Sequence, residues 1–302
     1  MQYFFSLISD YARSVDKLAF FLISLFVGIL VFINYRYGWE SKIWTANTTL
    51  ERFLRFYIMY LLAFAGAYLI QFAVKPQSTK GEPLVLALLI VIAPAIFAVK
   101  VAFYDHKQFF SKYAFKLLDY PIKAIFVLCT LYFLWRWIKP YAPFCGLTFN
   151  NFQLKPYLLL LACMIPLIAL ASFRPDFLHA YPKYKMIVAL GGTHWYDKLL
   201  FEISYGIDFF TIEVFFRGFL VLAFAHFVGK DAILPMAAFY CVIHFGKPLP
   251  ECISSYFGGL ILGVLVYQTQ TIIGGLLVHL GIAWLMEYGG YLGSYLTAKV
   301  AK

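Results

Sequence analysis

Residues 198–228 read KLLFEISYGIDFFTIEVFFRGFLVLAFAHFV, an apolar run that is long enough to cross a bilayer yet carries acids and an arginine. A transmembrane helix needs about 20 mostly apolar residues, and ionisable groups within one are rare and costly. The whole chain has the same character, because 63% of its 302 residues are hydrophobic and 13% are charged. A soluble domain is about 25% charged. We therefore predict an all-α, polytopic transmembrane helix bundle.

Nine apolar segments predict about 8–9 spans. Near residue 198 the pattern changes: ionisable residues stand at the ends of the segments before it and inside the segments after it. We therefore expect N-terminal transmembrane helices without a motif over 1–194, and a core transmembrane domain with a polar pocket over 195–302. The approximate segments are 18–35, 53–74, 84–103, 121–138, 157–173, 199–228, 232–246, 251–268 and 272–292.

The net charge of +10 belongs to short segments between the apolar runs. Lys and Arg at such positions extend their charged ends to the membrane surface and attract anionic head groups. No basic cluster with interleaved stacking aromatics stands apart from the apolar runs. We therefore expect membrane lipids as partners and no nucleic acid.

One face of the 198–228 segment carries two acids and the arginine. At about 100° per residue, Glu213 and Arg217 lie about 40° apart around a helix, and Glu202 returns to within about 20° of Glu213. Pairing the acid with the guanidinium lowers the cost of burying each. A structural ion pair that holds helices together is the alternative to a functional one.

Two histidines stand deep in later apolar segments. His244 precedes Gly246, Lys247 and two prolines in HFGKPLPE, and His279 is central in GGLLVHLGIAW. Taken singly, each could be a core histidine. Ionisable groups avoid lipid and point into a bundle, so we expect the three segments to present theirs to one polar pocket. Glu251 opens the segment after His244, where a carboxylate suits a helix N-terminus.

A carboxylate and an imidazole together can activate water as a general base. Arg217 can orient the acid, and a second imidazole can donate a hydrogen bond to a developing oxyanion. We therefore assign Glu213, His244 and His279 as candidate catalytic residues, supported by Arg217, Glu202 and Glu251. The first three could also bind a catalytic zinc ion, but no H-E-x-x-H sequence occurs, so no cofactor is assigned with certainty.

These motifs resemble those of a known family. The order E-x-x-x-R-G, a histidine near the end of the next helix, and another histidine two helices later is similar to the CaaX protease and bacteriocin-processing (CPBP) family of intramembrane endopeptidases. The resemblance covers about 195–292. The sequences that carry it are FFRG (215–218), HFGKP (244–248) followed by Glu251, and GGLLVHLGIAW (274–284).

The resemblance also implies roles for residues. In the family, the first glutamate of E-E-x-x-x-R acts with the second-motif histidine to activate water. The third-motif histidine, with an Asn four residues later, polarises the scissile carbonyl. Glu213 matches the second glutamate, Arg217 the arginine, His244 the second-motif histidine and His279 the third-motif histidine.

Two positions depart from the family pattern. Ile212 stands where the first glutamate is expected, and Ala283 stands where the Asn is expected. Either another carboxylate takes over the role of the first glutamate, or the protein does not cut peptide bonds. The candidate carboxylates are Glu213, Glu202, Asp208 and Glu251.

Three functions remain open from the sequence. The first is a CPBP-type endopeptidase, expected in a bacterial inner membrane, that cleaves a peptide or membrane-protein substrate near the membrane with water activated by glutamate and histidine. The second is a catalytically inactive CPBP-like scaffold or partner subunit of a larger complex, which Ile212 and Ala283 favour. The third is a proton-linked transporter, which buried charges and broken helices fit, although 1–194 shows no matching inverted half.

Overall fold

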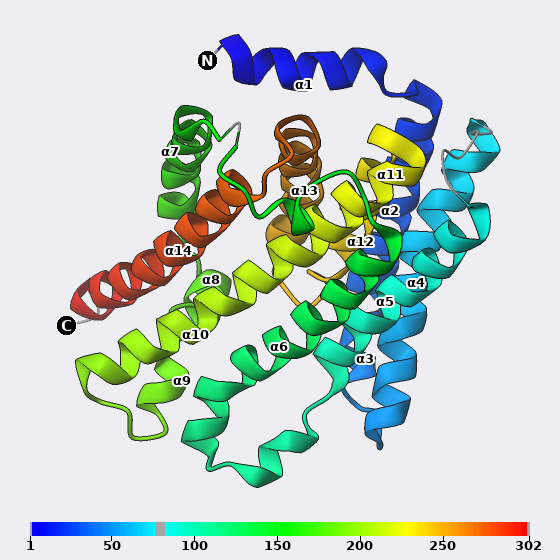
Figure 1. Ribbon diagram of the computed structural model, residues 1–302. Helices are drawn as coiled ribbons and strands as arrows, with labels where there is room; N and C mark the ends of the chain where they lie inside the picture. Colours follow the sequence, from blue (N-terminus) through cyan, green and yellow to red (C-terminus); the bar gives the residue numbers. More distant parts are fainter. Residues whose placement is uncertain (1, 76–81, 151, 301–302) are drawn as a thin grey trace. The chain divides into compact units, whose positions relative to one another are not determined.

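The computed structural model describes residues 2–75, 82–150 and 152–300, and every regular element among them is a helix (Figure 1). The predicted all-α fold is confirmed. The chain forms two compact units, each made of segments that are distant in the sequence. Unit 1 lies within 1–105, 126–151 and 214–272, and unit 2 lies within 106–125, 152–213 and 273–302. The division at residue 195 describes where the motifs lie, and it stays a prediction.

Among the described residues, unit 1 contains eleven whole elements and the second part of α6. They are α1 (Gln2–Ser14), α2 (Lys17–Tyr37), α3 (Trp39–Ile43), α4 (Thr49–Val74), α5 (Pro83–Ala102), the short 3-10 helices η2 (Phe144–Gly146) and η4 (Gly229–Ala232), the π-helix η3 (Val214–Ala223), α11 (Phe224–Val228), α12 (Ile233–Val242) and α13 (Leu249–Thr269).

Unit 2 contains the first part of α6 and the helices that carry Glu213 and His279. The elements are α6 (Lys112–Ile138), α7 (Leu154–Ala171), α8 (Pro175–Ala180), α9 (Lys185–Val188), α10 (Trp195–Glu213) and α14 (Ile273–Val300), preceded by the 3-10 helix η1 (Asp105–Phe109) at the boundary with unit 1.

Six helices of the described part of the chain are long and apolar enough to cross a membrane: α2, α4, α5 with its extension to Phe109, α6, α7 and α13. The protein is therefore a multi-pass membrane protein. Three further predicted spans do not meet this measure. The 199–228 segment is divided among α10, η3 and α11, and α12 has only 10 residues. The apolar run of α14 is interrupted by glycines and by its buried acid, Glu287.

Helix α12 is the centre of unit 1 because all its residues are buried. A helix that is apolar on every side must be surrounded by other helices, and α12 packs against α4 and α13. The ring of Phe239 lies 5.2–5.8 Å from those of Tyr60, Phe64, Phe97 and Phe216, measured between ring centroids. Such aromatic contacts stabilise a core beyond their buried area.

In unit 2, α7 packs closely on the glycine-containing face of α14. A Cβ atom placed on Gly274 would lie 2.0 Å from the ring of Tyr157, and one on Gly281 would lie 2.8 Å from the side chain of Leu161. These glycines therefore permit a close approach of the two helices.

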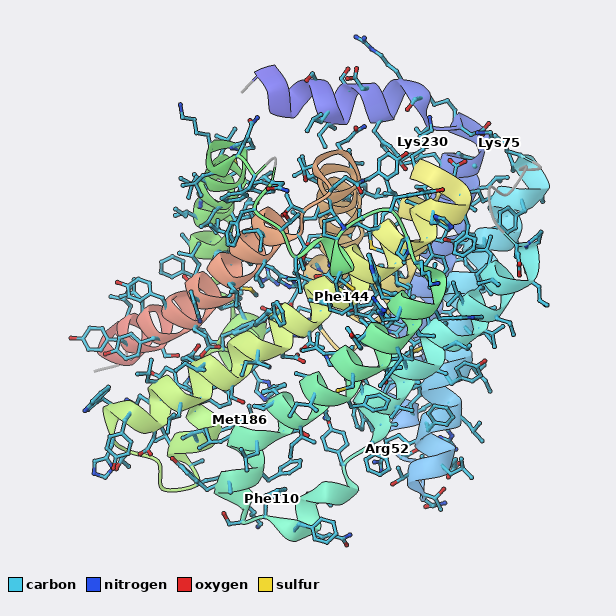
Figure 2. All side chains as sticks on the ribbon, in the orientation of Figure 1. Arg52, Lys75, Phe110, Phe144, Met186 and Lys230 are labelled. Carbon is cyan, nitrogen blue, oxygen red and sulfur yellow. The ribbon has the colours of Figure 1, made fainter. Side chains whose placement is uncertain are left out.

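One polar contact fixes the end of the amphipathic helix α1 within unit 1. The amino group of Lys230 donates to the carbonyl of Ser14 at 2.6 Å, and the neighbouring Asp231 pairs with Lys75 at the end of α4 at 3.5 Å. Figure 2 labels both lysines. Tyr11, three residues before Ser14 and so on the same face of α1, is buried, so the helix is anchored on one face.

Candidate functional site

Four of the six predicted site residues fall into two groups, one in each unit. We call the unit 2 group the Glu213 cluster, which consists of Glu213, His279 and Phe209. His279 Nδ1 lies 2.9 Å from Glu213 Oε1, and Glu213 has no exposed surface. The ring of Phe209 lies 4.7 Å from that of His279. The structure thus joins the glutamate of the first motif to the histidine of the third.

A second acid of α10 faces the same partner helix. Glu202 lies next to Glu287 of α14, so Glu202 and Glu213 both face α14, as expected from their eleven-residue separation. The Glu287 carboxylate accepts hydrogen bonds from the backbone N–H of Lys183 at 2.7 Å and of Tyr184 at 3.3 Å. Glu287 therefore holds the chain before α9 against α14.

We call the unit 1 group the Arg217 cluster, which consists of Arg217, Tyr240 and His244. The guanidinium carbon of Arg217 lies 3.9 Å from the centre of the Tyr240 ring, and Arg217 has no exposed surface. A cation over an aromatic face is attracted to it, most strongly where water is excluded. The His244 ring contacts the same tyrosine, with centroids 4.8 Å apart. Tyr240 thus connects the arginine and the histidine.

Arg217 lies on a π-helix, not on the α-helix that the sequence analysis assumed. Hydrogen bonds in a π-helix run from residue i to i+5, and such segments are rare and frequent at functional sites. The angular argument for Glu213 and Arg217 therefore applies only up to Glu213. Gly218 permits close packing here, because a Cβ atom on it would lie 2.6 Å from the carbonyl oxygen of Cys145.

The proton on His244 is assigned by its hydrogen bond. Nδ1 lies 2.8 Å from the carbonyl oxygen of Tyr240, and a carbonyl oxygen can only accept. Nδ1 therefore carries the proton, and Nε2 of the neutral ring is an acceptor. This tautomer suits a general base.

The loop after His244 is held by residues that the sequence analysis did not identify. Asn34 Nδ2 donates to the carbonyl of Phe245 at 3.0 Å, and the Tyr35 hydroxyl donates to the carbonyl of Lys247 at 2.6 Å. The Glu40 carboxylate lies against Gly246, where an added Cβ atom would meet it at 3.0 Å. We call these three residues the loop clamp. The sequence signal that could have pointed to this clamp is Asn34, a polar residue within the apolar 18–35 segment.

The supporting residues have different surroundings. Glu251 lies in the first turn of α13 and pairs with Lys247 at 3.3 Å. Ile212 is part of α10, and Ala283 is buried in α14. Among the residues that the structure describes, no group of three or more His, Cys, Asp and Glu side chains is placed to hold a metal ion. Zinc binding by Glu213, His244 and His279 stays a prediction.

A multi-pass helical membrane protein with buried acid, guanidinium and imidazole groups is the class that these observations define. Within it, residues 198–285 match the family model described as type II CAAX prenyl endopeptidase Rce1-like. This match confirms the resemblance to the CPBP family for that segment. No curated protein and no solved structure matches the chain.

Proposed function

We propose that the protein is a membrane-embedded endopeptidase that cleaves a peptide bond near the membrane. The observation that carries the proposal is the 2.9 Å contact between His279 and Glu213, within the segment that matches an endopeptidase family. A structural ion pair needs only opposite charges. An imidazole held by a buried carboxylate is also the arrangement by which proteins orient histidines for catalysis.

The proposed mechanism gives each histidine its own task. His244 accepts a proton from the attacking water on Nε2, because its Nδ1 proton is held by the Tyr240 carbonyl. Glu213 orients the ring of His279, whose Nε2–H donates to the oxyanion of the tetrahedral intermediate. Such a donor is worth about 10²–10³ in kcat. Arg217 supports the site through its contact with Tyr240. All of these residues belong to the core that we assign to 195–302.

The test is cleavage by the purified protein in lipid nanodiscs. The first probe is a peptide with a prenylated C-terminal CAAX sequence, compared with the same peptide without the prenyl group, because the matching family is described by that activity. Glu213→Gln should lower kcat by about 10²–10³ and leave the folded yield intact, while the exposed Asp176→Asn should cleave normally. Full activity in Glu213→Gln would end the proposal. The resemblance to bacteriocin-processing enzymes favours a bacterial inner membrane, which fractionation of the source cells tests.

A catalytically inactive scaffold or partner subunit is the second candidate. Ile212 and Ala283 favour it, because neither can transfer a proton or donate the hydrogen bond of the residue it replaces. It predicts that Glu213, Arg217 and His244 can be replaced singly without a phenotype in the source cell, while substitutions on the outer surface of the helices disturb a complex that co-purifies with the protein.

A further inference from the structure

A hollow lies where the chain turns between two spans of unit 1. Both α2 and α4 are apolar enough to cross a membrane, so the connecting helix α3 lies at a membrane surface. The hollow, which we call the α3–α4 hollow, has a volume of about 280 Å³. It is lined by Trp39, Lys42, Ile43, Arg55 and Ile58. Tryptophan and basic residues are typical of the interface between lipid and water.

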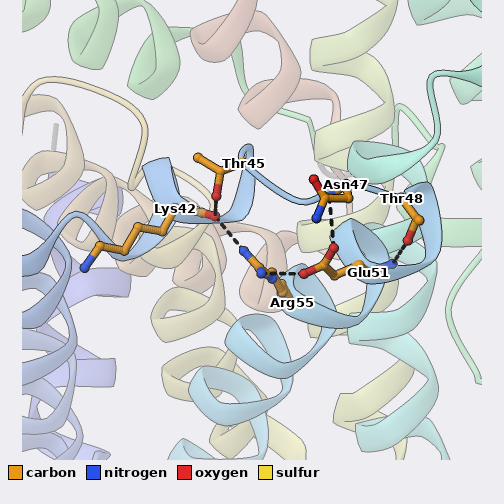
Figure 3. Close-up of polar contacts among 6 residues, drawn as sticks. All are labelled: Lys42, Thr45, Asn47, Thr48, Glu51 and Arg55. Atoms are coloured by element: carbon orange, nitrogen blue, oxygen red, sulfur yellow. Dashed lines mark hydrogen bonds and ion pairs between the residues drawn. The ribbon is translucent and has the colours of Figure 1, made fainter.

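The Arg55 guanidinium is fixed in place at this hollow (Figure 3). One nitrogen donates to the carbonyl of Lys42 at 2.8 Å, and the other pairs with Glu51. Glu51 is itself fixed by the backbone N–H of Asn47 at 2.9 Å. Arginine has five N–H donors, so most remain for a ligand. A fixed, planar guanidinium suits the oxygens of a phosphate group.

The charges around the hollow match one negative charge. Lys42 and Arg55 contribute two positive charges, and Glu51 contributes one negative charge. The net charge of these three side chains is one positive charge, which neutralises the single negative charge of a phosphodiester. Lys42 is exposed, and its flexible side chain can follow the position of the ligand.

Apolar surface continues from the hollow along α4. Ile58 lines the hollow and is 59% exposed, and Leu54 and Leu62, one helical turn away on either side, are each 45% exposed. Residues four apart share a helix face, so these three form a stripe that faces lipid. A ligand that fills the hollow and follows this stripe needs a charged head and an apolar tail.

We propose that the α3–α4 hollow binds the phosphate head group of an anionic membrane phospholipid, with an acyl chain along Leu54, Ile58 and Leu62. Phosphate is the recognised chemistry, and the lipid is its source. The site is independent of the proposed peptidase activity, because it requires neither the Glu213 cluster nor the Arg217 cluster.

The experiment measures lipids retained by the purified full chain in native mass spectrometry, after exchange into detergent with phosphatidylglycerol or phosphatidylcholine. The unmodified protein should retain more phosphatidylglycerol than phosphatidylcholine. The double variant Lys42→Ala, Arg55→Gln should weaken that retention by about tenfold, or about 1.4 kcal/mol. The control double variant Lys155→Ala, Arg136→Gln removes the same charges from exposed positions of other helices and should retain the lipid.

Three further arms decide between outcomes. Lys42→Ala alone changes only an exposed side chain and should still weaken lipid retention. This single variant therefore tests the proposal even if the double variant does not fold. Ile58→Asn should weaken lipid retention through the tail. Inorganic phosphate at millimolar concentration should not displace the lipid. Equal retention by the two double variants would overturn the proposal, and so would complete displacement by inorganic phosphate, because the ligand would then be a soluble phosphate.

Discussion

His279 Nδ1 and Glu213 Oε1 lie 2.9 Å apart although 66 positions separate the two residues in the sequence. The contact joins α10 to α14. Because Glu202 of α10 lies next to Glu287 of α14, the two helices run antiparallel with two acidic positions of α10 along their interface. The carboxylate nearer the end of α10 has an imidazole partner, and the earlier one has a second carboxylate.

The Glu213–His279 contact predicts strongly non-additive kinetics. Glu213→Gln and His279→Asn should each lower kcat by about 10²–10³. Both changes disable the same oxyanion donor of the proposed mechanism, the Nε2–H of His279. The double variant should be little worse than either single one, as expected of residues that act as a unit. The measurement is single-turnover cleavage of the prenylated peptide. Losses that multiply in the double variant would show that the two residues act independently.

The loop clamp predicts a role for α2 in positioning His244. Asn34→Leu removes the donor to the Phe245 carbonyl and leaves a buried acceptor without it, which costs about 1–3 kcal/mol. We expect kcat to fall while KM changes little, since the loop carries the proposed base. Asn47→Ala, at an exposed position of unit 1, is the control. If Asn34→Leu lowers only the folded yield and the folded fraction cleaves normally, the clamp is structural.

The helical fold and the position of Glu202 and Glu213 on one face of α10 were predictable because both depend on local periodicity. Apolar runs of about 20 residues predict spans, and an eleven-residue separation places Glu202 and Glu213 on one face. The π-helix was not predictable, because its backbone departs from the 100° rotation only where tertiary packing stabilises it. Gly218 against Cys145 is part of that packing, and no local pattern contains a contact across more than 70 residues.

The loop clamp shows a second limit of the sequence. Asn34 and Tyr35 contact residues more than 200 positions away. The match to the family model begins only at residue 198, so a motif search assigns nothing to α2. Only the burial of Asn34 in an apolar helix marks it, because a buried amide needs partners.

Gly218 predicts a specific packing defect. Gly218→Ala places a Cβ atom 2.6 Å from both the carbonyl oxygen and the Cβ of Cys145, and backbone atoms cannot move aside as a flexible side chain can. We expect a loss of about 1–3 kcal/mol of stability, as for other overpacked cores. Gly28→Ala is the matched control, because nothing lies within 4 Å of a Cβ atom there. Thermal unfolding in detergent should separate the two variants, and equal midpoints would contradict the close approach.

The contact between Tyr240 and Arg217 predicts that the stability of the protein depends on the aromatic ring of Tyr240. Tyr240→Leu removes the aromatic face over which the buried Arg217 lies, and it should lower stability by about 2 kcal/mol. Tyr240→Phe keeps that face and should lose much less. Thermal unfolding of the two variants gives the comparison. Equal losses would show that the hydroxyl, and not the ring, is what the structure requires.

Asp197, at the start of α10, predicts the acid sensitivity of unit 2. The Tyr113 hydroxyl donates to Oδ1 at 2.5 Å, and the backbone N–H of His194 donates to Oδ2 at 3.0 Å. These hydrogen bonds, that of Tyr113 first, hold the pKa of Asp197 below its ordinary value of 3.8. The folded state therefore binds the ionised form better, so its stabilising contribution is complete above pH 3.8 and is lost as the pH falls through the lowered pKa.

Asp197→Asn should accordingly unfold at a lower temperature than the unmodified protein at pH 7. The difference between the two should shrink below pH 3.8, because the unmodified side chain then becomes neutral as well. Thermal unfolding in detergent between pH 7 and pH 3 measures this. Asp176→Asn is the control, since Asp176 is exposed, lies 3.4 Å from the exposed Arg174 and accepts a hydrogen bond from the adjacent backbone N–H of Phe177. A difference for Asp197→Asn that stays constant down to pH 3 would mean that its packing, and not its charge, stabilises the start of α10.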